Sequence, residues 1–208
     1  MSSIIQTHPK DPLTAIVHSR EAFLIASRDF TDFHAVLWMR SPEIIAAAQK
    51  LYDDVSIIST ALEVFHCNIL YPIGLTVMIS EAKADLMLGS NPNLPNSIFE
   101  NIPLVRDDFL LAAELYESGF ESMHMYHREG ENCAPDSQYD MPHEDPETTL
   151  YFQYAGAGLR VFPNKNNLQD SWEMPNGSAL FMRPECCHAR AKIQDMEAKG
   201  RFALNYFK

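Results

Sequence analysis

The sequence has few of the features that cross-link a chain or hold it in a membrane. Its four cysteines are Cys67, Cys133, Cys186 and Cys187, and no two of them form a C-x-x-C pair. Because adjacent cysteines do not readily form an ordinary disulfide, we expect reduced thiols and a cytoplasmic location. The longest apolar run, Ile69 to Ile79, contains a proline and a glycine and is too short for a membrane-spanning helix. No membrane partner is therefore expected.

Positive charge is also scarce. The chain has 16 Lys and Arg against 28 Asp and Glu, which gives a formal net charge of −12. Such an acidic balance disfavours a broad basic surface, so we expect no nucleic-acid partner. The first ten residues lack the basic start and the continuous apolar segment of a secretory signal, so we expect the whole chain to be mature protein.

The remaining composition is that of an ordinary globular protein. Hydrophobic residues make up 46% and charged residues 21% of 208 residues. This length fits one domain with a sizeable core, and we expect 1–208 to fold as a single domain. Within it, 1–119 reads as a mainly helical support region and 120–208 as a β-rich core.

The first half carries two helix patterns. Ser41-Pro42-Glu43 combines a capping hydroxyl, a proline suited to the first helical position and an acid in the first turn. A second helix is predicted over Arg106 to Ser118, with Gly119 at its end. Between them, Leu62 to Ile79 is rich in β-branched and aromatic residues and predicts one or two strands. Residues 91–96 predict a loop between the halves.

After Gly119 the hydrophobic periodicity changes to two. Short strands with turn-rich connections indicate a sandwich or a barrel. The predicted strands cover Glu121 to Arg128, Thr148 to Tyr154, Leu159 to Phe162, Ser178 to Arg183 and Arg201 to Phe207.

The triplet His143-Glu144-Asp145 is the first candidate for chemistry. In an extended chain, residues i and i+2 point to the same face, so one imidazole and one carboxylate can bind one metal ion. We expect the triplet to open a strand. Predicted strands and Gly or Asn turns follow it, and His188 and Arg201 come after them in that order.

With these residues in this order, the sequence resembles the jelly-roll oxygenases that use Fe(II) and 2-oxoglutarate. The resemblance covers about Glu121 to Lys208. It implies an α+β fold in which a helical layer supports a double-stranded β-helix. It also implies iron ligation by His143, Asp145 and His188. Two imidazoles and one carboxylate leave open positions on the ion for the 2-oxo acid and dioxygen.

The same resemblance implies a binding site for 2-oxoglutarate and a small-molecule substrate that is oxidised, typically by hydroxylation. Arg201 would bind the far carboxylate of 2-oxoglutarate, since guanidinium pairs with carboxylate in a planar, bidentate geometry. The family often has Arg-x-Ser where this chain has Arg201-Phe202-Ala203, and Lys192 or Lys199 could act instead. Further candidates are Tyr126 for the co-substrate and Arg160, Trp172 and Arg190 for the substrate.

Several alternatives stay open. His127-Arg128-Glu129, with His124 before it, has the same i, i+2 geometry as the first triplet. Cys186 and Cys187 could favour zinc or copper(I), although buried small hydrophobic residues are the simpler interpretation. Trp172 and the arginines could equally serve packing and salt bridges. At the level of the whole protein, the rivals are a zinc-holding binding or regulatory module and a structural sandwich in which His143 is a turn residue.

Overall fold

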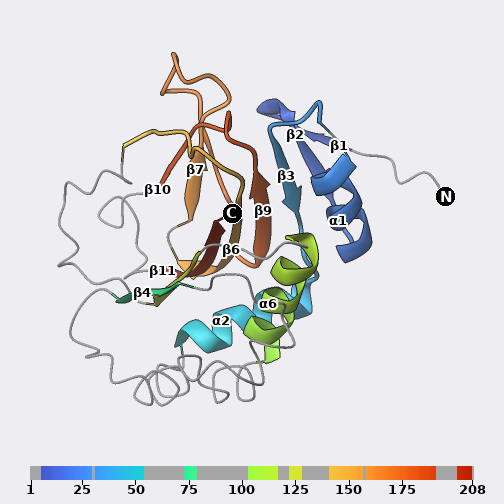
Figure 1. Cartoon of the computed structure of the whole chain (residues 1–208), viewed down its shortest axis with the longest axis vertical. Coiled ribbons are helices and arrows are strands. Elements are labelled where there is room, and N and C mark those ends of the chain that lie inside the picture. Colours follow the sequence, from blue (N-terminus) through green and yellow to red (C-terminus); the bar gives the residue numbers. More distant parts are fainter. Residues whose placement is uncertain are drawn as a thin grey trace.

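A computed structural model gives the fold of the chain (Figure 1). It describes residues 6–29, 31–53, 73–78, 103–116, 122–127, 141–156, 158–190 and 201–207. Two β-sheets and three helices make up the described residues. Among these helices, none is long and apolar enough to cross a membrane.

The larger sheet has eight strands. They lie in the order β1-β2-β3-β9-β6-β11-β5-β4, and all neighbours are antiparallel except β2 and β3. Strands from both halves of the sequence therefore lie in one sheet. Their bounds are β1 Gln6–His8, β2 Asp11–Val17, β3 Ala35–Trp38, β4 Ile73–Met78, β5 Ser122–His127, β6 Thr149–Gly156, β9 Ser178–Met182 and β11 Arg201–Phe207.

The smaller sheet has three antiparallel strands in the order β10-β7-β8. Their bounds are β7 Leu159–Val161, β8 Trp172–Glu173 and β10 His188–Arg190. An isolated β-bridge adds His143 beside His188 at the edge of this sheet. The three strands are short because loops with several Asn, Asp and Pro residues separate them.

The helices α1 (Arg20–Asp29), α2 (Pro42–Asp53) and α6 (Pro103–Leu115) pack on one face of the larger sheet. On α1, Phe23 stacks on Trp38 of β3 at 5.6 Å between ring centroids. Tyr116, next to the end of α6, contacts Phe181 of β9 at 6.5 Å. Along β3 and β9, the residues next to Trp38 and Phe181 point away from the helices, because side chains alternate between the two faces of a sheet.

The opposite face of the larger sheet packs against the smaller sheet. The apolar cluster between the two sheets draws on β3, β6 and β9 on one side and on β7 and β8 on the other. Its buried members are Ala35, Leu37, Tyr151, Leu159, Val161, Trp172, Met174, Leu180, Met182 and Cys186. The described residues thus form three layers: helices, larger sheet and smaller sheet.

A buried ion pair holds α6 to the larger sheet. Arg40, which is 5% exposed, contacts both carboxylate oxygens of Asp108 through Nη1 at 2.7 Å. Its Nε donates to the carbonyl of Gly177 at 2.7 Å, and the Tyr154 hydroxyl donates to Asp108 at 2.7 Å. Since a buried charge is tolerated only when it is paired and hydrogen-bonded, these contacts fix where the helix lies.

The predicted α+β class is confirmed, and so are several elements. The helix predicted to begin at Ser41-Pro42 is α2, and the second predicted helix is α6, which begins three residues earlier than Arg106. All five strands predicted after Gly119 are present, as is β4 within Leu62 to Ile79. The loop predicted over 91–96 lies outside the described residues.

The interpretation of 1–119 as helical support is incomplete, because β1, β2 and β3 also belong to the larger sheet. No strand was predicted before Leu62. In β3 all four residues, Ala35 to Trp38, are buried, so the strand has no alternating pattern to detect.

Candidate metal centre

His143, Asp145 and His188 converge. Each offers one ligand atom, and these atoms lie within 4.8 Å of one another. The Nε2 atom of His143 is 3.8 Å from one carboxylate oxygen of Asp145, and the Nε2 atom of His188 is 3.5 Å from the other. The structure therefore brings the three predicted ligands together.

Backbone pairing sets the positions of the two imidazoles. The amide of His143 donates to the carbonyl of His188, and the amide of His188 donates back, both at 2.9 Å. The ring centroids of the two residues are 4.5 Å apart. Residues that exchange both hydrogen bonds across an antiparallel pair point to the same face, so both rings face one point.

The prediction that the triplet opens a strand is wrong. His143 makes only the isolated bridge, and β6 begins at Thr149. The physical reason lies in the flanking prolines, Pro142 and Pro146, which have no amide hydrogen to continue a ladder. The i, i+2 argument still places Asp145 beside His143, because the chain between the prolines is extended enough for the bridge.

Hydrogen bonds orient each candidate ligand. The Nδ1 atom of His143 lies 2.8 Å from the carbonyl oxygen of Met141, and that of His188 lies 3.0 Å from the carbonyl oxygen of Cys186. A carbonyl only accepts, so Nδ1 carries the proton in each ring and Nε2 presents its lone pair toward the centre. This is the arrangement that a metal-binding histidine needs.

Thr149 orients the carboxylate. Its hydroxyl donates to Oδ2 of Asp145 at 2.6 Å, and the threonine is 1% exposed. Sequence reasoning missed this residue. The available signal was a threonine four residues after Asp145, at the start of a predicted strand.

Burial also favours the neutral form of His188, which is the form that binds a metal. Desolvation lowers the pKa of His188 from its ordinary value, and the neighbouring His143 lowers it further. The negative charge of Asp145 and the hydrogen bond to the Cys186 carbonyl oppose this shift but do not cancel it. His188 is therefore ready to ligate at neutral pH.

The centre faces the space between the two sheets. His188 is paired with Val161 of β7, and directly paired residues lie on the same face of a sheet. Val161 belongs to the apolar cluster between the sheets. The candidate ligands thus border a largely apolar interior on one side, while the side chains of His143 and Asp145 are 26% and 14% exposed.

The candidate co-substrate residues are only partly described. Arg201 begins β11, and its backbone is paired with Gly156 of β6. Tyr126 lies in β5, with its backbone paired with Ala203. The described part of the structure does not include the side chains of Arg201, Tyr126 and Arg190, nor Lys192 and Lys199.

The two proposed substrate residues whose side chains are described lie on opposite faces of the smaller sheet. Arg160 alternates with the core residues Leu159 and Val161 on β7, which puts its side chain on the outer face of the smaller sheet. Trp172 is a buried member of the core, and its Nε1 donates to Asp11 at 3.3 Å. Because Trp172 is paired with Val161, which is paired with His188, it lies on the same face of the smaller sheet as that candidate ligand.

The structure also places the alternative metal ligands. Cys186 and Cys187 are free and buried, and neither belongs to the one group of candidate metal ligands found among the described residues. Burial raises the pKa of the Cys186 thiol well above its usual range, which disfavours the thiolate that soft metals need. The alternative built on His124, His127 and Glu129 lies outside the residues whose side chains are described.

Comparison with known proteins gives matches by structure. No family model matches the sequence, and no curated protein matches it. A candidate oxygenase from Shewanella oneidensis is similar over 93% of this chain and 88% of its own, with a TM-score of 0.51 and 13% identity.

Two further matches have lower TM-scores. An oxidoreductase of the 2OG-Fe(II) oxygenase family from Burkholderia pseudomallei has 13% identity and a TM-score of 0.42, with 91% of this chain and 89% of that chain covered. A dioxygenase for auxin oxidation from Arabidopsis thaliana, in complex with 2-oxoglutarate, has 12% identity and a TM-score of 0.45, with 93% and 91% covered. The predicted resemblance to an oxygenase is thus confirmed as a likeness of fold to the Shewanella structure.

Proposed function

We propose that this protein is an Fe(II)- and 2-oxoglutarate-dependent oxygenase that hydroxylates a small molecule. One observation carries the proposal: two imidazole Nε2 atoms and one carboxylate converge on a single point, each oriented by its own hydrogen bond. Two histidines and one carboxylate on one face are the ligand set of non-haem iron oxygenases. The fold shared with the Shewanella structure supports the same class.

The proposal includes the architecture. We infer a double-stranded β-helix within one domain, in which 120–208 supplies the metal-bearing core. The two facing sheets with an apolar interior support it, and so does the position of the metal centre at the edge of the smaller sheet. A cytoplasmic setting is proposed with it, and the free thiols of Cys186 and Cys187 support that setting.

His143, Asp145 and His188 would hold the iron, and bound ferrous iron with 2-oxoglutarate would supply the oxidising power for a C–H bond. The protein itself would position the ligand side chains and limit the access of water. The carbonyls of Met141 and Cys186 and the hydroxyl of Thr149 fix the ligand side chains. The apolar cluster between the sheets would limit the access of water to the metal face from that side.

Arg201 would bind the far carboxylate of 2-oxoglutarate, with Tyr126 as a second contact. The register supports this assignment, because β11 lies between β6 and β5 and thus puts both residues on adjacent strands of the larger sheet. The substrate class follows from charge: a net charge of −12 favours a small molecule over a nucleic acid.

Anaerobic addition of Fe(II) and 2-oxoglutarate to the purified protein tests the proposal. The ternary complex should give a visible metal-to-ligand charge-transfer band. His188→Ala and Asp145→Ala should abolish the band, whereas His18→Ala, at an exposed histidine, should leave it unchanged. Arg201→Ala should leave Fe(II) binding intact and weaken 2-oxoglutarate binding.

The alternative outcomes separate the rivals. Tight Zn(II) binding without any ternary complex would support a zinc-holding binding or regulatory module. Failure to bind any divalent metal would leave a structural sandwich. If the ternary complex does form, product analysis by mass spectrometry distinguishes hydroxylation from other oxidations, because hydroxylation adds the mass of one oxygen atom to the substrate.

A further inference from the structure

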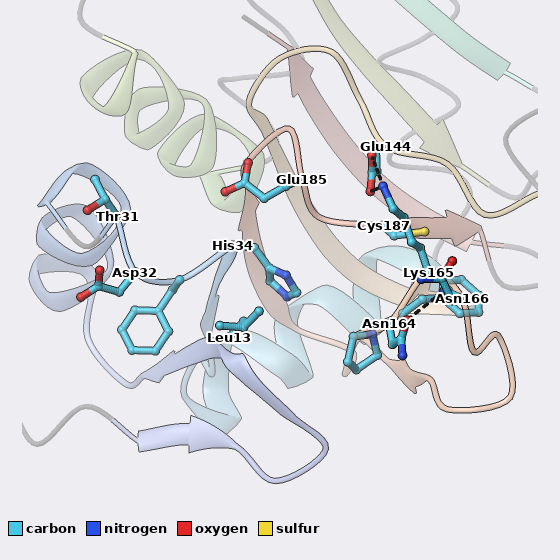
Figure 2. A pocket seen from close by; sticks show the side chains of 13 residues that line it. Leu13, Thr31, Asp32, His34, Glu144, Asn164, Lys165, Asn166, Glu185 and Cys187 are labelled. Atoms are coloured by element: carbon cyan, nitrogen blue, oxygen red, sulfur yellow. Dashed lines mark hydrogen bonds and ion pairs between the residues drawn. The ribbon is translucent and has the colours of Figure 1, made fainter.

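A second concave site lies apart from the metal ligands. It is a pocket of about 420 Å³ where the starts of β2 and β3 meet the loop after β7 (Figure 2). None of His143, Asp145 and His188 lines it. Its volume is within the range of small-molecule sites, about 300–1,000 Å³.

The pocket lies behind the metal centre. Glu144, between two candidate ligands, and Cys187, next to the third, both line it. Cys187 packs with Phe162 in an apolar cluster separate from the one between the sheets. Since neighbouring residues of an extended chain point to opposite faces, the pocket and the metal face lie on opposite sides of the same backbone segments.

A buried histidine lines this pocket with one nitrogen unused. His34 is 7% exposed, and its Nε2 lies 2.9 Å from Oδ2 of Asp11. Within the described residues, no hydrogen bond to its Nδ1 is present. Figure 2 shows the imidazole in the middle of the lining residues, between Leu13 and the chain that carries Glu185.

The state of Asp11 decides the tautomer of this imidazole. Burial alone would raise the pKa of Asp11, but hydrogen bonds from His34, Thr14 and Trp172 and the charge of His34 outweigh it and lower the pKa. The carboxylate is thus ionised and only accepts, so Nε2 of His34 carries a proton. When the ring is neutral, Nδ1 is therefore a hydrogen-bond acceptor.

The charge of the pocket is negative. Glu144 is neutralised by Lys165, whose ammonium lies 3.0 Å away. Asp32 and Glu185 also line the pocket, and neither has an ion pair within the described part of the chain. The exposed carboxylates of Asp32 and Glu185 thus have no counter-charge among the described residues. Apolar walls come from Leu13, Phe33 and Phe162.

We propose that this pocket binds a small organic amine, with the ammonium group near Asp32 or Glu185, a donor to Nδ1 of His34, and an apolar body against Phe162 and Leu13. Three observations carry the proposal together: the pocket itself, an almost fully buried imidazole with one free nitrogen, and two unpaired carboxylates. An anion would meet repulsion, and a neutral alcohol would use only the imidazole. The site is independent of the proposed metal chemistry.

The proposal is tested by ligand-observed NMR titration of the full chain with three probes of similar shape. Benzylamine, benzyl alcohol and benzoate have the same ring and differ in charge. We expect benzylamine to bind more tightly than benzyl alcohol by about fivefold, and benzoate to bind more weakly still. Equal binding of the three probes, or no benzylamine binding, would overturn the proposal.

Variants assign the binding to this pocket. Glu185→Gln and Asp32→Asn should each weaken benzylamine binding by about two- to fivefold and leave benzyl alcohol binding unchanged. His34→Gln retains a donor toward Asp11 but moves the acceptor from the position of Nδ1 to the amide oxygen, so it should weaken both probes at an unchanged melting temperature. Asp170→Asn, an exposed carboxylate outside the pocket lining, is the matched control. If Asp170→Asn weakens benzylamine binding as much as Glu185→Gln, the effect is one of net charge and the proposal fails.

Because the test uses no metal, it is separate from the test of oxygenase function. His188→Ala should retain benzylamine binding whether or not it retains Fe(II). Loss of benzylamine binding in that variant, with a normal melting temperature, would place the amine at the metal centre and contradict a separate site.

Discussion

Replacing Thr149 with valine should weaken metal binding without unfolding the protein. Valine has nearly the shape of threonine and suits a β-strand, so the first strand residue after the ligand triplet keeps its packing. What disappears is the hydroxyl that donates to Oδ2 of Asp145 at 2.6 Å. The carboxylate then loses the contact that holds it toward the two imidazoles.

The structure sets the size of this effect. A hydrogen bond to a charged group contributes about 1.5–3 kcal/mol, and each 1.4 kcal/mol is about a tenfold change in affinity. The range is therefore about 10- to 100-fold. The side chain of Asp145 is 14% exposed, so water can partly replace the hydroxyl. We expect the lower end, about a tenfold rise in the metal dissociation constant.

Competition titration of Zn(II) or Co(II) against a chromogenic chelator measures that constant. Thr149→Ser keeps a hydroxyl on the same Cβ and should bind the metal within about threefold of the wild type. Thermal denaturation of each metal-free variant controls for folding. If Thr149→Val binds as tightly as Thr149→Ser, the hydroxyl does not position the ligand and the reasoning about the oriented carboxylate is refuted.

The remaining predictions concern stability. Asp108→Ala should lower the free energy of unfolding by about 3–5 kcal/mol in urea denaturation, because it leaves the buried Arg40 guanidinium without its counter-charge; a loss below about 1 kcal/mol would contradict a structural ion pair. Gly177→Ala should cost about 1–3 kcal/mol, since φ is +74° and an added Cβ would lie 2.3 Å from Cγ1 of Ile45; an unchanged melting temperature would refute this. Because the pKa of Asp11 is lowered in the folded chain, its contribution to stability is present above about pH 4 and is lost as the pH falls through the folded pKa. The difference in unfolding free energy between wild type and Asp11→Asn should therefore shrink on acidification, and a difference that grows below pH 4 would show the opposite sign of shift.

Local patterns predicted the elements that have a clear period or cap. The proline and acid after Ser41 gave the start of α2, and alternation gave β5 and β11 within a residue or two. Some elements without such a pattern were missed, β3 and β8 among them. In β3 every residue is buried, and β8 has two residues, so neither shows a period that could be counted.

The polar contacts were harder to predict than the strands, since each joins distant parts of the chain. Asp11 and His34 are 23 residues apart, and Arg40 and Asp108 are 68 apart. A single sequence gives no sign that two such residues meet, because their contact depends on how the sheets and helices pack. The pocket beside His34 was missed for the same reason.

The identity of the metal ligands could be predicted from the types and the order of the residues along the chain. How their side chains are placed relative to one another could not. His143 and His188 are 45 positions apart in the sequence, yet two backbone hydrogen bonds of 2.9 Å place them directly opposite each other. That bridge fixes the imidazoles, and the i+2 position of Asp145 then adds the carboxylate to the same face. Between β7 and β9, the loop after β7 adds an exposed ion pair from Lys165 to Glu144, so changes in loop length that keep this pair should leave the three ligand atoms in place. What the alignment does require is the extended backbone between Pro142 and Pro146, because losing the bridge would turn one imidazole away from the other two ligands.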